Sequence, residues 1–166
     1  MEKILDVAKY LCDSYYAQTS EKIDEMKLHK LLYFAQRESY AICNVPLFSE
    51  KMEGWIHGPV SLEVRRLFYD GNIEAKNLSD ISIEAKRIIN GVIEEYGSLA
   101  SWKLRDMSHN EISWLNSRKG LAPNEPSNVD LKESDIQKDA QKVRPFDHTW
   151  GMYYDEFDNA EETNDK

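Results

Sequence analysis

The chain has 166 residues, of which 41% are hydrophobic and 31% are charged, and its formal net charge is −9. A chain of this length fits one domain with at most a short tail. The acidic balance argues against a general nucleic-acid binder, because contacts to phosphates need clustered Lys and Arg. Four tryptophans, nine tyrosines and five phenylalanines supply enough apolar surface for a core, so disorder along the whole chain is excluded.

Cysteine usage and hydropathy indicate the compartment. Cys12 and Cys43 cannot build a disulfide framework, and the sequence has no CxxC motif. Residues 1–6 lack the apolar run of a signal peptide, and no stretch approaches the roughly 20 apolar residues of a membrane-spanning helix. We therefore expect a soluble, cytoplasmic protein with no membrane partner.

The charge is unevenly distributed along the chain. Residues 147–166 carry seven acidic residues and one lysine, a net charge of −6, which leaves −3 for residues 1–146. Residues 161–166 have no large apolar side chain to bury and read as disordered. The sequence therefore divides into a helical domain over 1–146 and an acidic C-terminal tail over 147–166 that contains aromatic residues.

Two long helices are predicted at the N-terminal end. Residues 4–17 place apolar side chains at helical spacing on one stripe. Residues 24–43 form a longer helix with Leu28, Leu31 and Leu32 on one arc, and a second side that holds Lys30, Tyr33, Arg37 and Tyr40. More than half of its circumference is apolar or aromatic, so we expect this helix to lie centrally and to pack on two sides.

The next part of the chain begins with a break. Residues 44–60 contain turn residues, with a short extended piece over 51–56. Ser61 then caps a helix to about residue 69, and further helices are predicted over 82–96 and 98–107.

Two S-x-x-E/Q sequences in the C-terminal part of the helical domain resemble capping boxes. They begin at Ser108 and Ser134 and predict helices over 109–118 and 135–143. The fold class is therefore mainly α: a single compact helical domain of about six to seven helices with a short irregular or extended segment near residues 46–60.

Signatures of catalysis are missing. The sequence has no P-loop, GxGxxG, HExxH or GxSxG motif. Cys43 and His57 could serve as a nucleophile and its base, but a buried thiol and a loop histidine explain them more simply. The four histidines stand singly, without the paired spacings of a zinc site. We expect no enzyme activity, no catalytic residues, no cofactor and no metal.

The most distinctive local feature is the segment 55–60, Trp-Ile-His-Gly-Pro-Val. Gly58 can adopt dihedral angles that other residues avoid, and Pro59 fixes the next φ, so the chain turns sharply toward the Ser61 cap. Trp55 is expected to cover the core below this turn, with its indole N–H on a carbonyl group. The corner is either structural or faces a ligand, and the structural interpretation is favoured because Gly-Pro turns usually serve architecture.

Several stretches together resemble one known family. Residues 27–36 read KLHKLLYFAQ and resemble the family's KLxKLLYFAQ helix, and residues 46–60 resemble its PLFxExxEAWxxGPV stretch, with Gly54 where the family usually has Ala. Ser108-His109 followed by Trp114 resembles its (S/T)H…W element. The ordered combination, over about residues 5–143, is similar to the Panacea domain, also called the SocA-like antitoxin domain, which includes phage-associated GepA-like proteins. The matching positions, expected to be mainly structural, are Lys27, Leu28, Leu31, Leu32, Trp55, His57, Gly58, Pro59, Val60, His109 and Trp114.

This resemblance implies an α-helical antitoxin of a type II toxin–antitoxin system, which neutralises a cognate toxin by direct protein–protein contact. It also implies an alternative, since the SocA-like branch is similar to a proteolytic adaptor that presents the toxin to an AAA+ protease. An enzyme of unknown reaction is a third and weaker alternative. Operator binding is disfavoured, because the basic pairs 65–66, 86–87 and 118–119 are short and lie on different predicted elements.

Two surfaces are predicted to bind the partner. The first is the side of the long helix that holds Lys30, Tyr33, Arg37 and Tyr40. Burial against a neighbouring helix is the alternative, and for Tyr33 it is at least as strong. The second lies in the tail, where aromatic residues alternate with acids that could meet a basic partner or fold back on the domain. Its candidate residues are Trp150, Tyr153, Tyr154 and Phe157.

Overall fold

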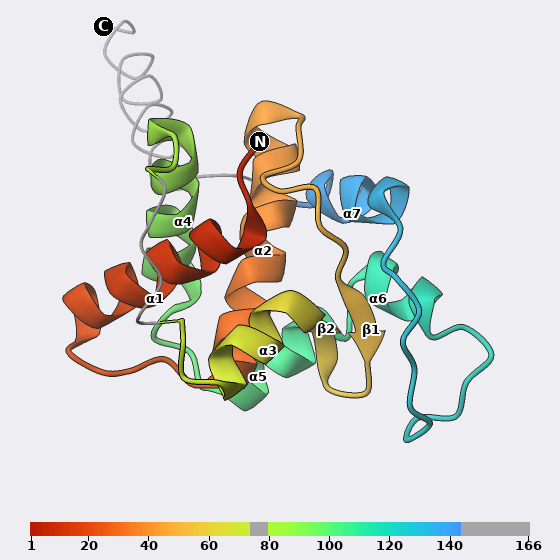
Figure 1. The fold of residues 1–166 in the computed structure, drawn as a ribbon. Helices are drawn as coiled ribbons and strands as arrows, with labels where there is room; N and C mark the ends of the chain where they lie inside the picture. The colour runs from red at the N-terminus through yellow and green to blue at the C-terminus, as the bar shows by residue number, and fades with distance from the viewer. Residues whose placement is uncertain (74–79, 144–166) are drawn as a thin grey trace, which may run out of the picture.

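The computed structural model describes residues 1–73 and 80–143, and within these ranges the fold is mainly α, as predicted (Figure 1). Seven helices and one two-stranded sheet are found in the described residues, and none of those helices is long and apolar enough to cross a membrane. The elements are α1 (Ile4–Thr19), α2 (Glu25–Cys43), β1 (Glu53–Trp55), β2 (Gly58–Val60), α3 (Leu62–Tyr69), α4 (Ile83–Tyr96), α5 (Ser101–Ser108), α6 (Ile112–Ser117) and α7 (Glu133–Ala140).

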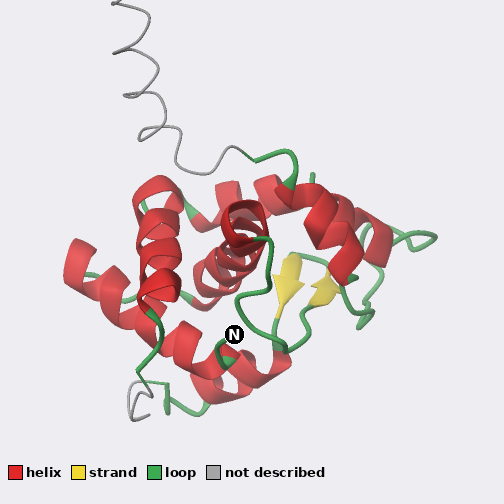
Figure 2. Cartoon of the chain, turned by 90° about the horizontal axis from the view of Figure 1, so that it is seen from above, coloured by secondary structure: helices red, strands yellow, loops and turns green. Residues whose placement is uncertain are grey.

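Helix α2 runs through the centre of the molecule, as its sequence pattern predicts. It contacts α1, α3, α4, α5, α7 and β2, and the view from above shows the other elements arranged around it (Figure 2). Every residue from Lys27 to Tyr40 is buried. The burial is thus wider than two-sided packing, and it includes seven polar or charged side chains of α2 that must find partners.

Two of these polar side chains show how the helix accommodates them. Lys27 Nζ donates to the carbonyl oxygen of Gly97 at 2.9 Å, after the end of α4. The side-chain amide of Gln36 pairs with the backbone of the segment before β1. Its Nε2 donates to Phe48 O at 2.9 Å, and its Oε1 accepts from Leu47 N and Phe48 N. These bonds hold the segment that precedes β1 against the middle of α2.

The extended piece predicted over 51–56 is present as β1, which pairs with β2 in an antiparallel hairpin. Ser61 caps α3, as expected, by accepting from Val64 N. The second strand over 58–60 was not foreseen, because a Gly-Pro sequence is a poor strand signal. On the other edge of β1, Gly54 N donates to Val129 O at 2.9 Å, so the loop before α7 also lies against the hairpin.

Both predicted capping boxes are wrong. Ser108 is the last residue of α5, and its hydroxyl group donates to Arg105 O within that helix. Ser134 lies inside the first turn of α7, which begins after Lys132 without a side-chain cap. The start of α6 is capped from a distance instead, because the carboxylate of Asp139 on α7 accepts from the backbone N–H groups of Ile112 and Ser113. A cap supplied by another helix leaves no S-x-x-E signal in the sequence.

Candidate functional site

The side of α2 predicted as a partner surface is buried. Lys30, Tyr33, Arg37 and Tyr40 are each at most 5% exposed. Contacts from α6 and α7 meet Tyr33, and a contact from α4 meets Arg37. The alternative of burial against neighbouring helices is therefore correct, and the prediction of an exposed surface here is wrong. The tail residues Trp150, Tyr153, Tyr154 and Phe157 lie outside the described residues.

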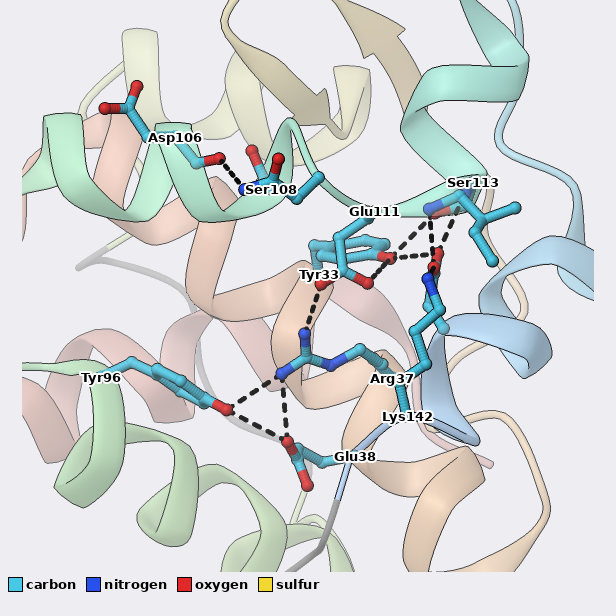
Figure 3. A network of polar contacts seen from close by, with 12 residues as sticks. Tyr33, Arg37, Glu38, Tyr96, Asp106, Ser108, Glu111, Ser113 and Lys142 are labelled. Atoms are coloured by element: carbon cyan, nitrogen blue, oxygen red, sulfur yellow. Dashed lines mark hydrogen bonds and ion pairs between the residues drawn. The ribbon is translucent and has the colours of Figure 1, made fainter.

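Tyr33 joins three separate segments through its hydroxyl group, as Figure 3 shows. The oxygen lies 3.1 Å from Glu111 Oε2, 2.8 Å from Ser113 Oγ and 2.9 Å from Asp139 Oδ2. Burial raises the pKa of Tyr33 well above its usual value, and the carboxylates of Glu111 and Asp139 raise it further. The hydroxyl group therefore keeps its proton and fastens α2 to α6 and α7.

Arg37 supplies the positive charge of the same network (Figure 3). Its Nη1 lies 2.6 Å from Glu111 Oε1, and its Nη2 lies 3.0 Å from Tyr96 OH and 3.3 Å from Glu38 Oε1. Burial lowers the pKa of Arg37, but Glu111, Tyr96 and Glu38 together outweigh burial and raise it. The network links α2 to α4 and to the segment before α6, and its charges face one another inside the protein. We interpret it as structural.

A cleft of about 490 Å³ opens beside the N-terminal half of α2. Its walls come from α2, the hairpin, α3 and the loop that precedes α7. The lining side chains are Glu25, Met26, His29, Lys30, Trp55, Ile56, His57, Val60, Arg65, Pro126, Ser127 and Asn128. This volume and this mixture of apolar walls with a few polar groups are typical of ligand-binding sites.

The hairpin meets α2 at the floor of the cleft through the Gly-Pro corner. Gly58 has φ +104°, and a Cβ atom there would lie 2.6 Å from Lys30 Cε and 2.5 Å from Ser108 Oγ. Only glycine meets both requirements at this position. The next residue, Pro59, accepts from Lys30 Nζ at 3.1 Å, and Ser61 N donates to His29 Nδ1 at 3.3 Å. The corner is therefore structural and also forms the site, so the two interpretations of the sequence are compatible.

The floor of the cleft carries two buried nitrogen groups. Burial, followed by the nearby charges of Lys30 and Arg65, lowers the pKa of His29 to about 3. Its ring is therefore neutral, and because Nδ1 accepts from Ser61, the remaining proton is on Nε2. Among the residues that the structure describes, that Nε2 finds no hydrogen-bond partner, although Glu25 Oε1 lies 3.5 Å away. Burial also lowers the pKa of Lys30 to about 7, against the opposing effect of Glu25 and Asp24.

At the rim of the cleft, two aromatic rings lie against one guanidinium group. The Cζ atom of Arg65 lies 5.1 Å from the centre of the Trp55 ring and 5.4 Å from that of Tyr69. The same guanidinium group bonds to Glu25 Oε1 at 2.5 Å. Tyr69 is 74% exposed, so the rim offers a large aromatic side chain to solvent. Tryptophan, tyrosine and arginine are the residues that most often dominate the energetics of protein interfaces.

Comparison with known families now bears on these positions. The family model described as the SocA-like antitoxin, Panacea domain matches residues 28–115, more than half of the chain. The chain belongs to this family. No curated protein and no solved structure matches it. The matched range lies inside the region 5–143 over which the sequence resemblance was recognised.

The motif of this Panacea domain divides into core and cleft. Leu28, Leu31 and Leu32 are fully buried, while Lys27 is bonded to the end of α4. The other motif positions gather near the cleft: Trp55, His57 and Val60 line it, Gly58 and Pro59 lie against Lys30, and the rings of His109 and Trp114 stack at 3.9 Å. Trp114 Nε1 donates to Trp55 O at 2.8 Å, which ties that stack to the hairpin.

One expectation for Trp55 is wrong. The side chain is only partly buried and lines the cleft, and its indole N–H donates to the carboxylate of Glu53 at 2.7 Å rather than to a carbonyl group. The strand pairing explains this. Gly54 faces Ser117, which leaves less room than a Cβ would need, so its neighbour Trp55 points to the opposite, open side of the hairpin.

The sequence did not reveal the roles of Arg65, Tyr69 and Arg118 in the Panacea domain. Arg65 and Tyr69 were separate features of the α3 sequence, although their i, i+4 spacing places them on one face. Arg118 was noted only as half of a basic pair. It is buried, bonds to Gly54 O at 3.2 Å and to Glu125 O at 2.7 Å, and so fixes the loop that closes one wall of the cleft. No local pattern predicts such a contact.

The suggested Cys43–His57 pair is not assembled. Cys43 is exposed at the C-terminal end of α2, whereas His57 lines the cleft with Lys30, which lies about 20 Å away from Cys43 along the helix. Over the described ranges, no three His, Cys, Asp or Glu side chains gather as metal ligands would.

Proposed function

We propose that this Panacea domain is the antitoxin of a type II toxin–antitoxin system, and that it neutralises its cognate toxin by direct binding at the cleft. Family membership supports the antitoxin role. The observation that carries the location is that motif residues far apart in the sequence converge on one cleft whose rim holds Trp55, Arg65 and Tyr69. Such a rim has the composition of an interface hot spot.

The proposal assigns no catalytic step to the chain. Binding needs only a shaped surface, and the groups at the cleft suit recognition: apolar walls, an exposed aromatic side chain on the rim, and hydrogen-bond donors at the floor. A neutralising interface of ordinary size buries about 800 Å² per partner, which is larger than the cleft itself. The cleft is thus the centre of the contact, and Tyr69 belongs to the surrounding area.

The test needs the toxin, which we expect to be encoded by the neighbouring reading frame. That frame is expressed alone and with this chain, and growth and the dissociation constant of the purified pair are measured. Tyr69→Ala is compared with Tyr16→Ala, which removes an equally aromatic and 56% exposed side chain on α1. We expect Tyr69→Ala to weaken toxin binding at least tenfold and Tyr16→Ala to leave it unchanged. Equal affinities for the two variants would place the interface elsewhere.

The same strains separate neutralisation from delivery to a protease. Direct binding predicts that the toxin stays neutralised in a host without its AAA+ proteases. If neutralisation disappears in that host while the two proteins still bind, the chain acts as an adaptor instead.

A further inference from the structure

The floor of the cleft holds buried hydrogen-bond donors that are not fully used within the described residues. His29 is 2% exposed, and within the described residues its Nε2–H group makes no hydrogen bond; Glu25 Oε1, at 3.5 Å, is bonded to Arg65. Lys30 is 1% exposed, and its ammonium group, with three N–H bonds, donates to Pro59 O. Buried donors are normally paired, so two under-used donors side by side suggest an acceptor that arrives from outside.

The charge balance indicates what kind of acceptor fits. Lys30 and Arg65 bring two positive charges to the cleft, and Glu25 is the acid that lines it. Glu25 is already bonded to Arg65 at 2.5 Å. While Lys30 is protonated, the described residues that line the cleft therefore carry one excess positive charge, in a chain whose net charge is −9. A single carboxylate balances that charge, whereas a phosphate dianion would exceed it.

The walls indicate what carries the acceptor. Met26, Trp55 and Ile56 line the cleft above the buried donors. A ligand that reaches the floor must pass these side chains, so an apolar or aromatic group next to its carboxylate gains contact area on the way.

We propose that the cleft binds an acidic side chain that neighbours an aromatic one on a segment of the toxin, with the carboxylate on Lys30 and His29 and the ring against Trp55. This inference rests on the proposed function and names the chemistry of the partner at the same site. The lowered pKa of Lys30 agrees with it, because burial disfavours the ammonium group and none of the described carboxylates is bonded to it.

The test uses the full chain and two synthetic peptides, acetyl-Gly-Trp-Glu-Phe-Gly-amide and the same peptide with Gln in place of Glu. Binding is measured by titration of amide chemical shifts. We expect the Glu peptide to bind at least tenfold more tightly than the Gln peptide, and Lys30→Met to bring the two affinities together. Equal binding of the two peptides to the natural chain, or no binding of either, overturns the proposal.

A second measurement does not depend on the fold of a variant. A carbodiimide joins a carboxylate to a neighbouring amine as an amide, so we expect it to link the Glu peptide to Lys30, as mapped by mass spectrometry. Linkage confined to exposed lysines such as Lys51 overturns the proposal. A third peptide with the sequence of residues 150–157 tests this chain as the source of the segment. Tighter binding of that peptide than of the Glu peptide would reassign the cleft from the toxin to the antitoxin's own tail.

These outcomes are independent of the toxin assay. If the peptides fail to discriminate while Tyr69→Ala still loses the toxin, the carboxylate inference is wrong and the proposed function stands. If the peptides discriminate but no neighbouring toxin is found, the proposed function fails and the chemistry of the cleft stands.

Discussion

The two ends of α2 bury cationic side chains in opposite ways. Toward the C-terminal end, Arg37 lies within 3.3 Å of carboxylates from Glu38 and Glu111, and its pKa is raised. Toward the N-terminal end, Lys30 is bonded to a carbonyl oxygen, and its pKa is lowered to about 7. The two residues are seven positions apart, two turns along one helix, so the difference comes from what the surrounding elements present to them.

This difference distinguishes a buried cation with a structural role from one with a role in binding. A buried charge with a well-placed partner connects helices, and its removal disturbs the partner it leaves behind. A buried charge without an anionic partner weakens the fold, and proteins keep such local violations mainly where a site needs them. The comparison therefore supports a structural role for the network at Arg37 and the proposed binding role of the cleft at Lys30, and the following variants test both roles.

The largest effect is expected at Arg37. Arg37→Met leaves the carboxylates of Glu111 and Glu38 buried without their cation, and should lower the free energy of unfolding by about 3–5 kcal/mol. Urea denaturation at pH 7 measures it. A loss below about 1 kcal/mol would contradict the structural role of the network.

The corner at the floor of the cleft comes next. Gly58→Ala combines an unfavourable φ with a clash on Lys30 and Ser108, and should cost about 3 kcal/mol. Gly71→Ala is the matched control, because Gly71 also has a positive φ but open space around it, and should cost about 1 kcal/mol. Equal losses of stability in the two variants would mean that the hairpin does not pack closely against α2 at Gly58.

Lys30 gives a pH-dependent effect of intermediate size. Between its lowered pKa of about 7 and its ordinary value of 10.5, the unfolded chain binds a proton that the folded chain has lost. This side chain therefore adds stability as the pH rises through that window, by up to about 1.4 kcal/mol per pH unit. The stability of the natural chain relative to Lys30→Met should grow between pH 7 and pH 9. A difference that stays constant with pH would show that Lys30 is paired in the folded state.

The smallest change in stability is expected at the rim. Arg65 and Glu25 form a partly exposed ion pair, so Arg65→Ala should lower the free energy of unfolding by less than about 1 kcal/mol. Thermal unfolding measures it beside Arg37→Met. Losses of similar size in the two variants would erase the distinction between the two regions.

Helix periods predicted most of the fold. The apolar spacing of α1, α2 and α4 and the Ser61 cap identified these elements to within about two residues, since these signals are local. The capping boxes failed because Asp139, a residue of another helix, takes over the cap of α6. A pattern of four residues cannot report a partner more than twenty residues away.

Only part of the candidate site could be predicted from the sequence. The Trp-Ile-His-Gly-Pro-Val corner is distinctive in the sequence, because the φ angles that Gly58 and Pro59 can adopt follow from their residue types alone. The sequence left open whether Tyr33, Arg37 and Tyr40 form an exposed face or are buried, because the groups that contact Tyr33 and Arg37 come from α4, from α7 and from Glu111 before α6. Equally, nothing local to α2 shows that Arg65 and the loop at 126–128 complete a cleft beside Lys30.

The assignment of binding to the cleft is tested most directly by the affinity of the purified toxin for Arg65→Ala and Arg66→Ala. These are adjacent arginines on α3; Arg65 lines the cleft, whereas Arg66 is exposed outside it. We predict that Arg65→Ala weakens binding at least tenfold, while each variant lowers the free energy of unfolding by less than about 1 kcal/mol. Equal affinity of the toxin for the two variants would contradict the account.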